Sequence, residues 1–95
     1  MFEDIFATPL QVKILKVFLE NPDGVFSTMA IAKKLSASPS AVLKRLGELE
    51  RLGIIKAVYI SKRLKLYQLN REKALVQILL RFYNELRNLD NDCSD

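Results

Sequence analysis

The chain has 95 residues, the size of a single domain spanning 1–95, and 49% of them are hydrophobic. It contains one cysteine, Cys93, and no histidine. One chain therefore forms neither an internal disulfide nor a Cys/His metal site, and histidine general-base catalysis is excluded. No apolar run approaches the roughly 20 residues of a membrane span, and the first residues carry acids where a signal peptide would be basic. We expect a cytoplasmic protein without a metal, a cofactor or a membrane partner.

The net charge of +4 conceals an uneven distribution of charge along the chain. Ten of the fifteen basic residues lie between Lys33 and Arg71, where the only acids are Glu48 and Glu50. The segments before and after this stretch are each net negative. Because a polyanion is bound by cations gathered on one surface, the middle of the chain is predicted to form such a surface.

The first predicted element is a helix that ends near Glu20. Thr8 is expected as its N-cap and Pro9 as its first helical residue, and apolar residues recur at helical spacing from Leu10 onward. The sequence Asn-Pro-Asp-Gly that follows predicts a turn. Residues 25–26 are then expected to pair briefly with a later strand.

Two short helices separated by a tight connection come next. Ser27 or Thr28 is expected to cap the first of them. Its inner face is predicted to consist of Met29, Ile31, Ala32 and Leu35. After the connection at 36–38, Ser38 is expected to cap the next helix, with Pro39 at its first position.

The helix that starts at Pro39 is strongly amphipathic. On a helical wheel, one side carries the core residues Val42, Leu46 and Leu49 and ends at Gly53. The opposite side carries Ser40, Lys44, Gly47 and Arg51. Leu43 lies between the two sides and is expected to pack on the segment that follows the helix or on the preceding helix. Gly53 is predicted to end the helix.

The remaining sequence predicts a hairpin and a long helix. Residues 54–60 read as a strand, 61–64 as a polar basic turn and 65–69 as the return strand. The last helix is expected over 71–89, followed by a frayed acidic tail. Its apolar residues step by four and three positions, which is the spacing of a heptad seam.

This order of elements resembles a winged helix-turn-helix domain. The segment 31–46, IAKKLSASPSAVLKRL, is similar to the helix-turn-helix core of bacterial and archaeal regulators. The segment 49–55, LERLGII, matches their recurring exit into the wing. The sequence YQLN at 67–70, followed by an apolar helix, is similar to the arsenic-repressor-like group and to winged helices associated with minimal nucleotidyltransferases.

The resemblance implies a mainly α fold with a small β-hairpin wing and a long C-terminal dimerisation helix. The helix-turn-helix is expected at about 27–53, the wing at about 54–70 and the last helix at about 71–89. The paired Cys or His residues of arsenic-repressor-type metal sensors are missing, so the resemblance does not extend to metal sensing. Nor does it extend to nucleotidyltransferase chemistry, since the Gly-Ser and paired-aspartate motif is missing as well.

The candidate partner is double-stranded DNA. A recognition helix enters the major groove only if its outer face is polar and slim near its N-terminus, and cations on the neighbouring helix and wing position it through phosphates. The DNA-binding residues predicted on this basis are Ser38, Ser40, Ala41, Lys44 and Arg45 on the third helix, Lys33 and Lys34 on the second, and Lys62, Arg63 and Lys65 in the wing.

The last helix has more apolar surface than so short a domain can cover, which predicts an interface. We expect a homodimer in which the seams of two chains pack together. The predicted interface residues are Leu75, Leu79, Phe82, Leu86 and Leu89. The alternative is that this helix folds back on its own domain.

The sequence therefore favours a dimeric, sequence-specific DNA-binding transcription regulator, most simply a repressor that acts by occlusion. Two alternatives stay open: a winged helix used as a protein-interaction module, and a sequence-tolerant architectural DNA-binding protein. An enzyme is not expected, because the acids are scattered and the three glycines form no phosphate-binding loop.

Overall fold

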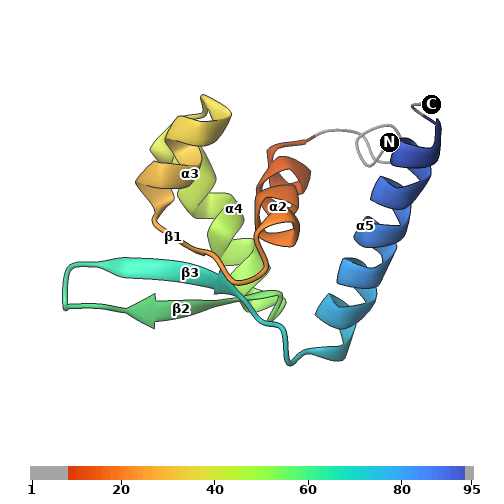
Figure 1. The fold of residues 1–95 in the computed structure, drawn as a ribbon. Helices are drawn as coiled ribbons and strands as arrows, with labels where there is room; N and C mark the ends of the chain where they lie inside the picture. The colour runs from red at the N-terminus through yellow and green to blue at the C-terminus, as the bar shows by residue number, and fades with distance from the viewer. Residues whose placement is uncertain (1–8, 94–95) are drawn as a thin grey trace.

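The structure is a computed structural model that describes residues 9–93. Within them, four helices and a three-stranded antiparallel sheet follow one another along the chain (Figure 1). The elements are α2 Leu10–Glu20, β1 Val25–Phe26, α3 Thr28–Leu35, α4 Pro39–Arg51, β2 Ile55–Tyr59, β3 Lys65–Leu69 and α5 Ala74–Cys93. This is the winged helix-turn-helix with a long last helix that the sequence predicts. No helix in the described part of the chain has the length and apolar character needed to cross a membrane.

Helix α2 begins one residue later than the sequence predicts. Pro9, expected at the first helical position, is the N-cap and has an extended ψ of 161°. Its carbonyl accepts the first helical hydrogen bonds, from the N–H groups of Val12 (3.0 Å) and Lys13 (3.2 Å). Proline fixes φ and leaves ψ open, so it fits either position. Thr8, the predicted cap, lies outside the described residues.

Both helices of the helix-turn-helix are capped by a serine: Ser27, one of the two caps expected for α3, and Ser38, the cap predicted for α4. The Ser27 hydroxyl accepts a hydrogen bond from the Ala30 N–H at 3.1 Å, and the Ser38 hydroxyl accepts one from the Ala41 N–H at 3.2 Å. Between them, Ser36 takes a left-handed conformation with φ of 53°. This residue turns the chain from α3 into α4 in a three-residue connection.

Helix α4 ends in a Schellman motif built on Gly53. The Ile54 N–H donates to the Leu49 carbonyl (3.0 Å), and the Gly53 N–H donates to the Glu50 carbonyl (2.9 Å). Gly53 has a φ of +77°, which only glycine adopts without strain. The glycine thus directs the chain from α4 straight into β2, as predicted.

The sheet has the strand order β1-β3-β2, with both pairs antiparallel. The wing hairpin pairs Ile55 with Leu69 at its base and Tyr59 with Lys65 near its tip. On the other side of β3, the short strand β1 is aligned with Gln68 and Tyr67, which confirms the pairing predicted for residues 25–26. Figure 1 shows that the C-terminal end of α4 meets the base of the β2–β3 hairpin, which extends away from the helices to its tip.

The core lies where α2, α3 and α4 meet the sheet. Its fully buried side chains come from every layer and include Phe18 of α2, Ile31 of α3, Leu46 of α4 and Tyr67 of β3. The inner side predicted for α4 is confirmed, since Val42, Leu46 and Leu49 are all at most 1% exposed. Burial of these apolar side chains fixes α4 on the body and leaves its opposite side in solvent.

Two side chains lie outside the core against expectation. Met29, predicted on the inner face of α3, is 64% exposed, because the first turn of α3 extends past the buried layer that begins at Ile31. Leu43, expected to pack on the wing or on α3, is 53% exposed on α4. Both residues lie near the start of a helix of the helix-turn-helix.

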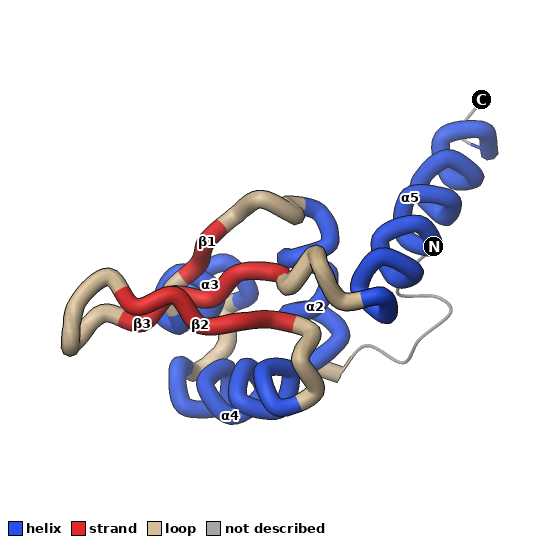
Figure 2. Tube along the Cα trace, turned by 90° about the horizontal axis from the view of Figure 1, so that it is seen from below, coloured by secondary structure: helices blue, strands red, loops and turns tan. Residues whose placement is uncertain are grey.

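Helix α5 differs from its predicted range of 71–89 at both ends. It begins at Ala74, after a turn in which the Lys73 N–H donates to the Asn70 carbonyl (3.2 Å). It runs on to Cys93, through most of the tail predicted to fray. No glycine or proline interrupts this segment, and the modest helix penalty of Asp and Asn does not end a helix by itself. Figures 1 and 2 both place α5 at the end of the molecule opposite the wing tip.

Candidate nucleic-acid interface

The N-terminal half of α4 presents small polar side chains to solvent. Ser38, Pro39 and Ser40 are exposed, and the hydroxyls of Ser38 and Ser40 lie 3.5 Å apart. Ala41, half-buried behind them, contributes its N–H to the Ser38 cap. This end of the helix is therefore slim and rich in hydrogen-bonding groups, which is the shape that fits a major groove.

Farther along the same side, α4 presents the cation Lys44 and then Gly47, which has no side chain. Lys44 is exposed one turn after Ser40, and it makes no ion pair within residues 9–93. A Cβ built on Gly47, one turn farther on, would meet no atom within 4 Å. The helix backbone can thus come closest to a neighbouring molecule at Gly47.

Arg45 is placed differently from Lys44. Its guanidinium donates to the Glu48 carboxylate at 2.7 Å, and its side chain is 39% exposed. The two residues are three positions apart on one face of the helix. A phosphate or guanine edge that binds Arg45 must share this guanidinium with Glu48 or displace Glu48 from it.

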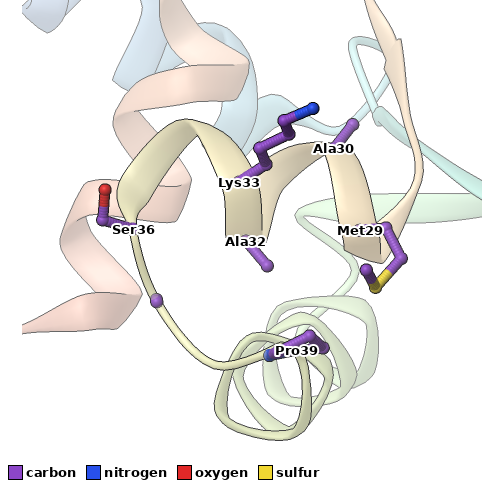
Figure 3. Close-up of a pocket in the computed structure, with 7 residues that line it drawn as sticks. Met29, Ala30, Ala32, Lys33, Ser36 and Pro39 are labelled. Atoms are coloured by element: carbon purple, nitrogen blue, oxygen red, sulfur yellow. The ribbon is translucent and has the colours of Figure 1, made fainter.

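The two lysines of α3 face different neighbours. Lys33 borders the hollow between α3 and the start of α4. Lys34 borders a second hollow, together with Lys13 and Lys16 of α2. Lys33, but not Lys34, therefore borders the hollow beside the start of α4, and Figure 3 shows its side chain extending away from Pro39. The sequence does not separate them, because both lie on the outer side of the helix.

The wing tip combines cations with apolar side chains. Lys62 and Arg63 are exposed in a turn where the Ser61 hydroxyl accepts hydrogen bonds from the N–H groups of Arg63 (3.3 Å) and Leu64 (3.1 Å). The large apolar side chains beside them are also exposed, Ile60 by 61% and Leu64 by 44%. The cations of the wing tip are predicted from the sequence, but its exposed apolar side chains are not, although the alternation of residues along the hairpin could have indicated them.

Lys65 links the wing to α4. Its ammonium lies 3.2 Å from the Glu50 carboxylate and 5.0 Å and 5.8 Å from the ring centres of Tyr67 and Tyr59. Burial acts to lower the pKa of Lys65, but interactions with Tyr67 and Glu50 outweigh it and raise the pKa above its usual value. Lys65, predicted as a DNA contact, thus already has partners in its own chain.

Most of the basic residues between 33 and 71 make no ion pair within the described part of the chain. Three are paired: Arg45 with Glu48, Lys65 with Glu50, and Arg71 with Asp23. The seven without such a pair are Lys33, Lys34, Lys44, Arg51, Lys56, Lys62 and Arg63. Both acids of the segment are used in pairs, so positive charge dominates the surface formed by α4 and the wing.

Comparison with known proteins identifies this arrangement. The model of the winged helix-turn-helix DNA-binding family matches residues 8–56, which is more than half of the chain. The chain belongs to the winged helix-turn-helix DNA-binding family. The matched segment contains α2, α3 and α4 and ends at the second residue of β2. No curated protein sequence gives a significant match.

Several solved structures share the fold over nearly all of this chain. FabT from Streptococcus pneumoniae, solved in complex with DNA, has a TM-score of 0.69 and 16% identity over 96% of this chain and 66% of its own. The apo form of a ZitR variant from Lactococcus lactis has a TM-score of 0.66 and 23% identity, covering 97% and 68%. The transcriptional regulator BldR from Sulfolobus solfataricus has a TM-score of 0.61 and 24% identity, covering 97% and 65%. The chain thus spans about two-thirds of the length of these proteins.

A second exposed surface of this winged-helix domain lies on α5. The predicted heptad seam is divided: Leu86 is buried and Leu79 is half-buried against the chain's own core, where Val76 and Tyr83 also pack. The side of α5 left in solvent carries Leu75 (44% exposed), Ile78 (53%), Phe82 (38%) and Leu89 (49%). Helix α5 therefore packs on its own domain with one side and keeps an apolar stripe on another. We call Leu75, Ile78, Phe82 and Leu89 the α5 stripe.

Proposed function

We propose that the protein is a transcription regulator that binds duplex DNA sequence-specifically as a homodimer and represses by occupying its site. The observation that carries the proposal is that the exposed side of α4 and the wing, which Lys65 and Glu50 join at the C-terminal end of α4, both carry cations without an ion pair among residues 9–93. Helix α4 would enter a major groove with Ser38, Ser40 and Lys44 toward the base edges. Lys33, Lys62 and Arg63 would hold flanking phosphates, which gives affinity without sequence information.

The homodimer is proposed to form through the α5 stripe. Four large apolar side chains on one side of a helix form a patch that usually marks an interface, and their spacing of three, four and seven positions repeats that of a helix–helix seam. Glu85 occupies the one position of this stripe that is not apolar. Because α5 and the wing tip lie at opposite ends of the molecule, pairing of two α5 helices leaves both wings at the outer ends.

A two-fold dimer of this kind has a geometric consequence for its target. Two copies of α4 related by a two-fold axis read the same sequence on opposite strands, so the target is a near-palindrome. Its half-sites are spaced by about one helical turn, roughly 34 Å, or a multiple of it. The role is one of binding, without enzymatic activity, in the cytoplasm.

The test is fluorescence anisotropy with labelled duplex DNA over a series of salt concentrations. Several phosphate contacts predict that the logarithm of the binding constant falls steeply with the logarithm of salt, by about 0.9 per contact. Lys44→Ala should weaken binding, and each lost phosphate contact should reduce the slope by about one. Lys73→Ala is the matched control, because Lys73 is exposed just before α5. This substitution removes the same charge at a position away from the start of α4.

Three results would count against the proposal in different ways. Absence of duplex binding at low salt would favour the protein-interaction module. Equal affinity for unrelated duplexes would favour the architectural DNA-binding protein, since a specific regulator binds its site about a thousandfold or more tighter than random DNA. An equal effect of Lys44→Ala and Lys73→Ala would show that overall charge, and not the α4 surface, drives binding.

A further inference from the structure

The start of α3 and the start of α4 enclose an open apolar hollow of about 640 Å³ (Figure 3). Its lining residues are Met29, Ala30, Ala32, Lys33, Ser36, Ala37 and Pro39. Figure 3 shows Met29 reaching from the first turn of α3 toward the end of α4 that carries Pro39. Met29 is the largest apolar side chain of this surface and the most exposed large hydrophobic residue of α3, at 64%.

The apolar surface continues along α4. Leu43 lies one helical turn after Pro39, on the same side of the helix, and it is 53% exposed. Single exposed apolar residues are ordinary in proteins. Here two large ones and a proline gather at the end of the helix-turn-helix where small polar residues also face solvent. We call Met29, Pro39 and Leu43 the apolar junction.

Cations flank the apolar junction on both helices. Lys33 borders the hollow itself, and Lys44 follows Leu43 in the chain. Neither lysine has an ion pair among residues 9–93. An occupant of this surface must therefore offer an apolar group within a strongly anionic setting. The major-groove edge of a thymine, with phosphates on either side, has this combination.

We propose that the apolar junction recognises thymine in the major groove through its 5-methyl group. The inference rests on the proposed DNA-binding function and adds a specificity determinant to it. The thymine methyl is an apolar group that no other unmodified base presents in the major groove, so an apolar surface beside Ser40 and Lys44 distinguishes T·A from C·G without a hydrogen bond. Leu43 and Met29 supply the methyl contact, and Lys33 and Lys44 hold the surrounding phosphates or base edges.

The test starts from a duplex recovered with the wild-type protein by selection from a random DNA library. Each thymine of the enriched motif is replaced in turn by deoxyuridine, which removes the methyl group and keeps every hydrogen-bonding atom. At one or more positions of each half-site, we expect binding to weaken about fourfold, the effect of exposing one buried methyl group. Leu43→Ala or Met29→Ala should remove this difference between thymine and uracil. Both side chains are mostly exposed, so the variants should fold.

Leu52→Ala is the matched control variant. Leu52 is the C-cap of the helix that carries Leu43 and is similarly exposed at 56%. It is nine residues away, which places it on the opposite side of the helix axis. The Leu52→Ala variant should keep the full difference in affinity between duplexes with thymine and duplexes with uracil. Thermal melting of the three variants confirms that each remains folded.

The possible results separate this inference from the proposed function. A selected motif that shows no loss at any thymine-to-uracil replacement overturns the inference and leaves sequence-specific binding intact. The inference is also overturned if the loss of affinity on thymine-to-uracil replacement persists in both Leu43→Ala and Met29→Ala. The same holds if this loss disappears in Leu52→Ala as well. A selection that enriches no motif overturns sequence-specific binding, and the inference with it.

Discussion

At position 47, in the middle of α4, the side chain is a single hydrogen atom with open space beyond it. Glycine in a helix interior costs about 1 kcal/mol relative to alanine, and the packing of this domain does not require it. Gly47→Ala should therefore raise the free energy of unfolding by about 0.5–1 kcal/mol and increase the melting temperature in a thermal denaturation experiment. The same variant should bind DNA more weakly, because the added methyl group keeps α4 away from the duplex.

These opposite changes make Gly47→Ala informative. If the variant is more stable and binds DNA as tightly as the wild-type protein in the anisotropy measurement, the helix does not approach DNA at this position. A variant of unchanged stability would contradict the open surroundings of Gly47 in the structure. A loss of affinity in a more stable protein cannot be attributed to unfolding, so this substitution separates stability from binding.

Individual residues could be predicted from the sequence where their role depends on near neighbours. Ser27 and Ser38 cap their helices by accepting from an N–H three residues ahead, and this local geometry is readable from residue type. The partners of Lys65 could not be predicted, since Glu50 is 15 positions away in the chain and meets it only after the wing folds onto α4. Met29 was misplaced because helical periodicity does not reveal where the buried layer of a neighbouring element ends.

The ion pair formed by Lys65 and Glu50 joins the wing to α4. Both side chains are about one-third exposed, so a coupling free energy of about 0.5 kcal/mol is expected. A double-mutant cycle with Lys65→Met and Glu50→Gln, measured by urea denaturation, should give this value at low salt and less at high salt. In the control cycle, Lys56→Met with Glu50→Gln should show no coupling, because exposed Lys56 forms no ion pair within residues 9–93.

The pH dependence of this coupling follows from the raised pKa of Lys65. A lysine whose pKa is higher in the folded than in the unfolded chain adds stability while it is protonated, below its unfolded pKa. That stability is lost as the pH rises through the folded pKa. The coupling should therefore be constant at neutral pH and disappear in strongly alkaline solution. A coupling that already vanishes near pH 8 would contradict the charged contact of Lys65 with Glu50.

Among the elements, α4 was the most predictable and α5 the least. A serine cap, a proline at the first position and a terminal glycine define α4 within its own sequence. Helix α5 has no comparable start or stop signal, and its bounds depend on the turn that precedes it and on the absence of a breaker. Its heptad spacing predicted one exposed seam, which the structure divides, because the residues of α5 that face the body depend on how α5 docks against α2. That docking is a tertiary contact, which periodicity alone does not determine.

Across the whole molecule, the proposed dimer requires the α5 stripe to be covered by a second chain. Ile78 is the most exposed residue of the stripe at 53%, so Ile78→Glu should leave the monomer folded while placing a charge in the interface. We expect the molar mass in light scattering to fall from that of two chains to that of one. Asn84→Glu, on the opposite side of α5 and also exposed, introduces the same charge and should remain dimeric.

Dissociation of the dimer should also change DNA binding in a defined way. A single chain presents one α4, so Ile78→Glu should bind a palindromic duplex no more tightly than a single half-site, whereas the wild-type protein gains from occupying both half-sites at once. A wild-type protein that is monomeric at micromolar concentration, or an Ile78→Glu variant that stays dimeric, would place the interface elsewhere. If Ile78→Glu is monomeric and still prefers the full palindrome, the two recognition helices are brought together by the DNA and not by α5.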